Sequence, residues 1–204
     1  MRREEFQYSD NENFEYIVKE AKIGQLAMMD NNDFPRIIPL NFVVFDKIVY
    51  FHGAKAGEKW DLIKKKPKCS FNIDIPYSFI PSYTMAKSFA CPATHFFKSI
   101  HIRGTVHEVQ SMKEKSMALQ GLMEKFQPEG NYLKITDSEP VYRKELENVG
   151  VFKVIPIEIT IKMKFGQNLN EKNRSSIIDF LEKRNIGRDR ETIEEMKKLR
   201  IQTN

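Results

Sequence analysis

One short stretch of the chain gathers glycines, lysines and a histidine at a single junction between two expected elements. The segment YFHGAKAGEK, residues 50–59, is expected to pass from a strand, through a turn at Gly53, into a helix. A helix N-terminus offers free backbone N–H groups and a positive dipole end, and Lys55 and Lys59 would add ammonium groups there. This combination predicts a phosphate site. Because the spacing matches neither G-x-x-x-x-G-K-[ST] nor G-x-G-x-x-G, a plain turn with solvated lysines is the alternative.

Two further polar residues precede this corner and could reach it. Arg36 begins the preceding expected strand, RIIPLNFVVF, and Asn41 lies in its middle. The strand is apolar at nearly every position, which predicts that both of its faces are covered. A buried amide needs a hydrogen-bonding partner. We therefore expect Asn41 to be buried beside the phosphate corner, where it would bind the polar edge of a heterocycle.

The remaining histidines and the cysteines form no catalytic or metal-binding motif. The chain contains no H-E-x-x-H, G-x-S-x-G or C-x-x-C sequence. His95, His101 and His107 are evenly spaced in one expected strand region, but six strand residues span about 20 Å, too far for one metal ion. Cys69 and Cys91 stand beside apolar residues, so we interpret both as reduced and structural. We predict no metal site.

Composition limits the class of protein. The chain has 204 residues, of which 41% are hydrophobic, enough for a real core. It has neither an apolar run long enough to span a membrane nor a targeting leader, so we expect a cytoplasmic protein that does not contact membranes. Its net charge of +5 is spread over helix faces of alternating sign, a pattern that argues against nucleic-acid binding.

The apolar pattern predicts strands joined by turns, with a few helices between them. Six strand segments are expected, at residues 23–30, 36–46, 47–53, 69–75, 95–110 and 150–166. Helices are expected at residues 12–21, between the glycine corner and Pro67, after Ser111, and on both sides of Gly187. Irregular loops are expected at 76–92 and 127–148. This order predicts a mainly β protein with flanking helices (α+β class), whose six-stranded antiparallel sheet closes into a small barrel.

Residues 34–71 and 96–104 carry a resemblance to a known family that covers roughly residues 15–165. They are similar to the flavin-binding split-barrel proteins related to pyridoxamine 5'-phosphate oxidase, and specifically to the 5-nitroimidazole resistance branch. That branch has a Pro-x-Asn-Phe strand, then Tyr-Phe-His-x-Ala, then Gly-x-Lys and an Asp before a Pro. This chain matches the pattern at Pro39, Asn41, Phe42, Tyr50, Phe51, His52, Ala54, Gly57, Lys59, Asp61 and Pro67. A later signature matches FFKSIHIRG, with Phe97, Ser99 and Gly104.

The resemblance implies an architecture, a cofactor and its contacts. It implies a split-barrel flavin-binding domain with an N-terminal helix at residues 1–166, a C-terminal helical extension at 167–204, and a homodimer that holds FMN between its subunits. The phosphate would meet Lys59, and also Arg36 and Lys55. Ser99 would be a supporting contact. The isoalloxazine would be lined by main chain of Pro39, Leu40, Asn41, His52, Gly53 and Ala54.

The resemblance also implies a function. The protein would be an FMN-dependent oxidoreductase, similar to nitroimidazole reductases, that passes electrons from NAD(P)H to a small-molecule acceptor. His52 is the candidate side chain nearest the ring. Some split-barrel proteins bind haem or only store a cofactor, so a non-catalytic flavin- or haem-binding protein is the alternative. A haem ligand would then be His95, His101 or His107.

Overall fold

A computed structural model describes residues 3–65 and 67–199 of the chain. Backbone contacts divide the described residues into two compact units. We call residues 18–73 and 101–159 the central unit, and residues 3–17, 74–100 and 160–199 the terminal unit. Each unit is described by itself below.

Eight strands form one sheet in the described part of the chain. Their order is β3-β2-β6-β7-β8-β5-β4, and β1 pairs with β8. Since β3 and β4 stand at the two ends of this order, the sheet is not closed, so the predicted six-stranded closed barrel is wrong in strand number and in closure. The bounds are β1 (Gln7–Tyr8), β2 (Gly24–Met29), β3 (Pro35–Leu40), β4 (Val43–Phe45), β5 (Ile48–Gly53), β6 (Lys68–Ile80), β7 (Thr94–Glu108) and β8 (Gly150–Lys164).

Helices accompany the sheet in both units. Strands β6, β7 and β8 contribute residues to both units, and so does the first α-helix. The helical elements are η1 (Glu4–Phe6), α1 (Asn11–Glu20), α2 (Glu58–Lys65), η2 (Ser82–Thr84), α3 (Met112–Phe126), α4 (Pro140–Asn148), α5 (Glu171–Arg184) and α6 (Asp189–Lys198). No helix in the described residues is both long enough and apolar enough to cross a membrane.

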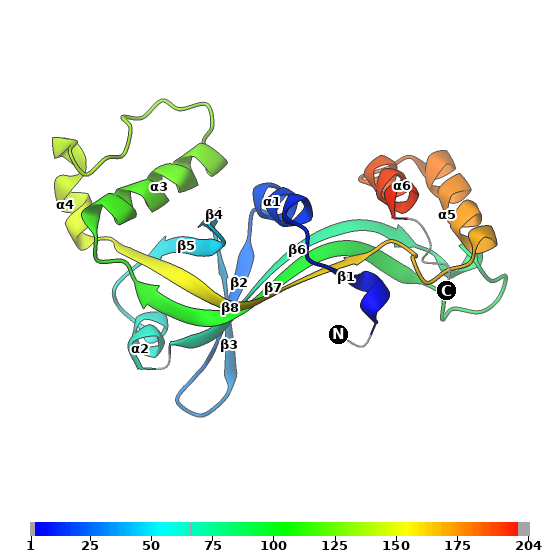
Figure 1. Cartoon of the computed structure of the whole chain (residues 1–204), viewed down its shortest axis with the longest axis horizontal. Coiled ribbons are helices and arrows are strands. Elements are labelled where there is room, and N and C mark those ends of the chain that lie inside the picture. The colour runs from blue at the N-terminus through cyan, green and yellow to red at the C-terminus, as the bar shows by residue number, and fades with distance from the viewer. Residues whose placement is uncertain (1–2, 66, 200–204) are drawn as a thin grey trace. The chain divides into compact units, whose positions relative to one another are not determined.

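The central unit packs helices on both faces of β5. Helix α3 lies against β4 and β5 (Figure 1), and a core of Tyr50, Val109, Ala118 and Val151 fills this side. On the other face, Phe51 stacks on Phe152 of β8 with ring centroids 5.3 Å apart. Trp60 of α2 covers the Phe152 ring at 5.9 Å. The alternation of side chains along a strand therefore sends Tyr50 and Phe51 into different layers.

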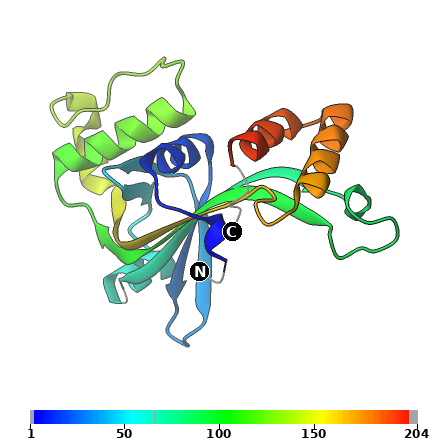
Figure 2. The same ribbon diagram turned by 45° about the vertical axis from the view of Figure 1, so that its right-hand side comes forward.

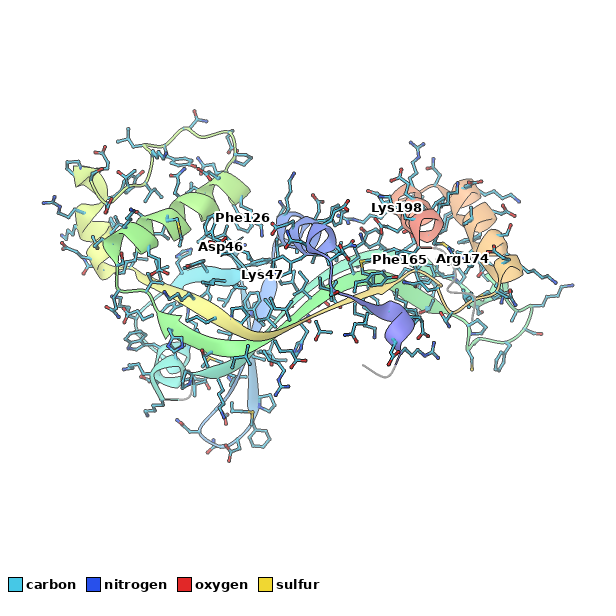
Figure 3. The ribbon with its side chains drawn as sticks, viewed as in Figure 1. Asp46, Lys47, Phe126, Phe165, Arg174 and Lys198 are labelled. Atoms are coloured by element: carbon cyan, nitrogen blue, oxygen red, sulfur yellow. The ribbon has the colours of Figure 1, made fainter. Side chains whose placement is uncertain are left out.

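A two-residue turn sets the register of β4 against β5. Asp46 and Lys47 form it, with φ of 50° and 66° (Figure 3). Two consecutive positive φ angles are typical of the type I′ hairpin turn, whose twist matches that of the strands. Phe45 therefore pairs with Ile48, and Val43 pairs with Tyr50.

The terminal unit is built around two buried polar centres. Helices α5 and α6 pack against each other (Figure 2). Arg174 of α5 is 6% exposed, and its guanidinium donates to the carbonyls of Phe165, Gly166, Met196 and Leu199. Figure 3 shows Arg174 beside Phe165. At the start of α6, buried Asp189 accepts from Ser78 at 2.6 Å and from Arg184 at 2.8 Å.

The structure confirms the predicted α+β class with an antiparallel sheet, and it corrects several details. Segment 36–46 forms two strands, β3 and β4, because strand structure is interrupted at Asn41 and Phe42. β3 is mostly exposed, so the prediction that both faces of this strand are covered is wrong. β6 continues to Ile80, into the predicted loop 76–92, and α4 occupies part of the predicted loop 127–148.

The predicted helix start at Ser111 and the two predicted C-terminal helices are confirmed. Ser111 caps α3 by accepting a hydrogen bond from the Glu114 backbone N–H. Two helices flank Gly187, as expected, although residues 200–204 of the tail lie outside the described residues. The division of the chain at residues 166 and 167 stays a prediction.

We expect Arg174→Met to destabilise the protein strongly, because it leaves several carbonyls without their donor. Hydrogen bonds to charged groups contribute about 1.5–3 kcal/mol each, so the free energy of unfolding should fall by roughly 3 kcal/mol or more. Urea denaturation followed by circular dichroism measures this. Lys172→Met, at an exposed position of the same helix, is the control and should change stability little. A loss below about 1 kcal/mol in Arg174→Met would contradict the role assigned to this side chain.

Candidate functional site

The predicted phosphate corner lies in the central unit, between the end of β5 and the start of α2. Gly57 precedes the helix with φ of +79°, a conformation that favours glycine. Its carbonyl accepts from the Asp61 backbone N–H at 3.1 Å, which closes the first turn. The local sequence therefore starts α2 directly after Gly57 and places Lys59 in its first turn.

The side chain of Lys59 lies back over Gly53, at the end of β5. A Cβ atom on Gly53 would stand 2.1 Å from Lys59 Nζ, so only glycine leaves room for the ammonium in this position. The same Nζ lies 5.8 Å and 5.6 Å from the ring centroids of Phe51 and Phe152. These distances are typical of cation–π contacts. The fold thus holds a cation over the end of the strand.

Lys59 differs from the other two predicted phosphate cations in forming no ion pair with a residue that the structure describes. Within residues 3–65 and 67–199, no carboxylate lies within 4.0 Å of its Nζ and no hydrogen bond to it is formed. Burial lowers the pKa of the Lys59 ammonium. Because a partly buried charge without a partner is costly, a bound anion would stabilise this arrangement.

The other two cations of the prediction have carboxylate partners. Arg36 of β3 contacts Glu58 of α2 through Nε at 2.9 Å and through Nη2 at 2.7 Å. Lys55 pairs with Glu108 of β7 at 2.9 Å. The Arg36 pair is about half exposed on both sides, so solvent weakens it. The sequence contained no local signal for either pairing.

His52 is electrostatically coupled to Lys59. Although His52 is exposed, the protein around it partly desolvates the ring, and this burial lowers the pKa of the imidazole. The positive charge of Lys59 lowers that pKa further. The ring is therefore neutral near pH 7, with one nitrogen that donates and one that accepts a hydrogen bond. Gly53 and Ala54 follow His52 directly, and the Lys59 ammonium lies over Gly53.

The Pro39–Asn41 segment differs from its prediction. Asn41 is exposed, not buried, and it lies in the gap between β3 and β4. Its amide donates to the Lys22 carbonyl at 3.2 Å. Pro39 is exposed and Leu40 is partly buried at the end of β3. The Asn41 amide thus holds the main chain at the point where β3 ends. The prediction that Asn41 lies in the middle of a strand is wrong.

One lysine that the sequence analysis did not single out holds the main chain between β3 and β4. Lys125, in the last turn of α3, donates to the carbonyls of Phe42 at 3.1 Å and Val18 at 2.8 Å. Its Nζ also lies 3.7 Å from the Phe42 ring centroid. Burial, and then the neighbouring charge of Lys22, lower the pKa of Lys125 to about 8. Helix α3 therefore positions the main chain that follows Asn41.

The remaining predicted residues lie on the long strand β7. Ser99 belongs to the terminal unit and is partly buried there. His95 contacts the Tyr77 carbonyl through Nε2 at 3.0 Å, and the His107 ring contacts Thr105 Oγ1 at 2.9 Å. His101 is exposed. No group of three metal-ligating side chains forms among the described residues.

The cysteines differ from each other. Cys69 is buried, and burial raises the pKa of its thiol to about 12. Cys91 is exposed, so the expectation that it is a structural residue is wrong. Apolar neighbours in sequence did not bury it, because the segment between η2 and β7 lies at the surface over much of its length.

Comparisons with known proteins identify the same family that the motifs indicate. The family model for pyridoxamine 5'-phosphate oxidase matches residues 10–163. No curated protein is significantly similar in sequence. Among solved structures, the chain is similar to a candidate 5-nitroimidazole antibiotic resistance protein from Bacteroides thetaiotaomicron, with a TM-score of 0.62 and 20% identity, covering 76% of this chain and 85% of that one.

Two other solved structures share the fold. The flavocytochrome Anf3 from Azotobacter vinelandii has a TM-score of 0.65 at 19% identity, covering 78% of this chain and 69% of that one. An FAD- and haem-binding protein from Mycobacterium smegmatis has a TM-score of 0.63 at 13% identity, with coverage of 78% and 73%.

The coupling between His52 and Lys59 can be tested directly. We expect the pKa of His52, measured by NMR titration of its ring, to lie below the ordinary value of 6.5. Lys59→Met should raise it, because removing a nearby positive charge favours the imidazolium. Lys65→Met, at an exposed position of the same helix, is the control and should leave it unchanged. An identical His52 pKa in the parent and in Lys59→Met would show that the two groups are not neighbours.

Proposed function

This chain belongs to the pyridoxamine 5'-phosphate oxidase family, and from that premise we propose that it is an FMN-binding flavoprotein with oxidoreductase activity toward small molecules. The observation that carries the proposal is the unpaired ammonium of Lys59, held in the first turn of α2 above Gly53. A phosphate is the group that such a corner fits, because it would meet both the charge and the helix N-terminus.

The residues around the corner fit a phosphorylated ring compound. Gly53 leaves space above the end of β5 for the Lys59 ammonium, and a side chain at this position would displace that ammonium. Arg36 would gain access to the phosphate by giving up its exposed contact with Glu58, a pair that is weak in water. His52, neutral near pH 7, would offer one hydrogen-bond donor and one acceptor to the polar edge of the ring.

A mononucleotide is favoured over a dinucleotide on two grounds. The sequence carries no G-x-G-x-x-G fingerprint that would bind a pyrophosphate. The corner also presents one unpaired cation, which suits a single terminal phosphate. The motifs shared with the 5-nitroimidazole resistance branch support the same choice. FAD is the competing cofactor, because one similar structure is named an FAD- and haem-binding protein.

The flavin would supply the redox chemistry, accepting electrons from NAD(P)H and passing them to a small acceptor. The protein would supply binding and orientation: Lys59 holds the phosphate end, the main chain of Pro39–Asn41 and His52–Ala54 lines the ring, and Lys125 keeps the Asn41 gap in place. A 5-nitroimidazole is the first acceptor to assay, because the sequence motifs resemble that branch most.

We also propose that the protein is a homodimer. Two strands of the central unit present large apolar side chains to solvent, with Ile37 of β3 65% exposed and Ile157 of β8 76% exposed. A second copy would cover them, and a permanent interface of this kind buries about 2,000 Å² or more. Light scattering of the flavin-loaded protein should give twice the mass of the chain, whereas a monomeric holoprotein would refute the dimer.

The cofactor itself is tested by its identity. The purified or reconstituted protein should absorb as a flavoprotein and release FMN on denaturation, as resolved by chromatography. Release of FAD or haem, or the absence of any chromophore after reconstitution with FMN, would overturn the proposal.

Lys59→Ala should weaken FMN binding without unfolding the protein. The variant removes a charged hydrogen bond to the phosphate but keeps the apolar contact of Trp60 with Phe152. Such hydrogen bonds contribute about 1.5–3 kcal/mol, so the Kd for FMN, measured by fluorescence quenching, should rise roughly tenfold to a hundredfold. Riboflavin, which has no phosphate, should bind the variant and the parent alike.

Lys65→Ala is the matched control, because Lys65 is exposed farther along the same helix. It should leave the Kd for FMN nearly unchanged. Equal losses in Lys59→Ala and Lys65→Ala would mean that general positive charge attracts FMN. An unchanged Kd in Lys59→Ala would mean that the corner is an ordinary turn with solvated lysines.

A further inference from the structure

A second pocket, separate in sequence from the Lys59 corner, lies in the terminal unit. It has a volume of about 240 Å³ and is formed by the N-terminal segment, the residues just before β7, the end of β8 and the loop that leads into α5. All of its lining residues belong to the terminal unit. The function proposed above makes no use of this pocket.

The polar wall of the pocket is cationic. Arg3 and Lys164 both line it. Lys162 lies two positions earlier on the same side of β8, and its charge also acts on Lys164. Burial, then Lys162 and Arg3, lower the pKa of Lys164. Three cations have therefore been brought together in a partly desolvated place, which is unfavourable unless an anion joins them.

The protein itself compensates little of this charge. Among residues 3–65 and 67–199, no aspartate or glutamate lines the pocket. Lys164 Nζ donates to the hydroxyl of Thr94, a neutral partner. The carboxylate that Arg3 contacts, Glu5, is at 4.0 Å and partly exposed, and such pairs contribute little in water.

The rest of the wall is apolar. Phe96, which is 1% exposed, and Leu169 both line the pocket. A ligand that fits must therefore carry its negative charge at one end and a small apolar body at the other. The volume lies below the range of about 300–1,000 Å³ that is usual for sites of drug-sized ligands, so that body must be small.

We propose that this pocket binds a small organic monocarboxylate, with the carboxylate on Lys164 and Arg3 and the apolar body against Phe96 and Leu169. Thr94 orients the Lys164 ammonium toward the ligand. Benzoate is the probe of this class, and benzamide is its neutral counterpart of the same shape. Inorganic phosphate carries the charge without the apolar body.

Cys91 provides a readout that does not depend on flavin or on activity. Its exposed thiol lines the same pocket, whereas Cys69 is buried with a raised pKa. Iodoacetamide alkylates a thiolate by forming an S–C bond as iodide leaves, and mass spectrometry assigns the reaction to one cysteine. A ligand in the pocket shields Cys91. Benzoate should therefore slow its alkylation at least about fivefold at saturation, while benzamide and phosphate at equal concentration should not.

Lys164→Met keeps an unbranched side chain, one heavy atom shorter, and removes its charge. It should raise the benzoate concentration needed for half-protection roughly tenfold, the effect of losing one charged hydrogen bond. Lys87→Met changes the net charge equally at an exposed position that does not line the pocket, and it should leave protection unchanged.

Several outcomes would overturn the proposal. Equal protection by benzoate and benzamide in the parent protein would show that the cations do not select the ligand, and this comparison needs no variant to fold. Absence of protection by benzoate would show that the pocket binds no such anion. Equal shifts in Lys164→Met and Lys87→Met would reduce the effect to net charge. Failure to bind FMN would affect none of these results, because the pocket shares no residue with the Lys59 corner.

Discussion

The close approach of β5 and β8 at two glycines is the constraint on which the central unit depends. Gly53 and Gly150 pair across these strands, and a Cβ atom on Gly150 would stand 2.5 Å from the Gly53 carbonyl oxygen. With no side chain at either position, the strand ends meet, and the ammonium of Lys59 can lie over Gly53. The aromatic layer of Phe51, Phe152 and Trp60 then supports α2 from the same side.

Three cations, Lys115, Lys125 and Arg174, donate hydrogen bonds to carbonyls at helix ends. Lys115 donates to the carbonyls of Leu146 and Val149, where α4 ends, at 2.7 Å and 3.2 Å. Lys125 donates to the carbonyl of Val18 in the last turn of α1, and Arg174 to those of Met196 and Leu199 where α6 ends. The last carbonyls of a helix have no partner within the helix, and they lie at the negative end of its dipole. These cations therefore complete helix ends.

Lys59 and Lys164 differ from this group because neither reaches a helix C-terminus. Lys59 stands at a helix N-terminus, where its charge and the helix dipole have the same sign. Lys164 faces other cations and a neutral hydroxyl. Among the described residues, neither lysine ammonium forms an ion pair with a carboxylate. The same electrostatic reasoning thus separates lysines that complete helix ends from lysines at which we propose anion binding, and it does so in each unit independently.

The local sequence was sufficient to predict the type of most elements and the strand-to-helix junction at residues 53–59. Period-two apolar patterns predicted the strands, Ser111 predicted the start of α3, and the glycines and lysines of residues 53–59 predicted the junction of β5 and α2. These features depend on neighbours along the chain, so their physical causes are visible in a short window of sequence.

Only the tertiary structure decided which predicted groups remain available. Arg36 and Lys55 form ion pairs with Glu58 and Glu108, while Lys59 has no carboxylate partner in the described part of the chain. Asn41 was expected to be buried but is exposed. It follows β3, which stands at one end of the sheet order, and it lies where the strand ends. Whether a charge is paired or a strand is covered depends on residues distant in sequence. Periodicity and spacing carry no information about these partners, since it is the packing of the whole chain that brings them together.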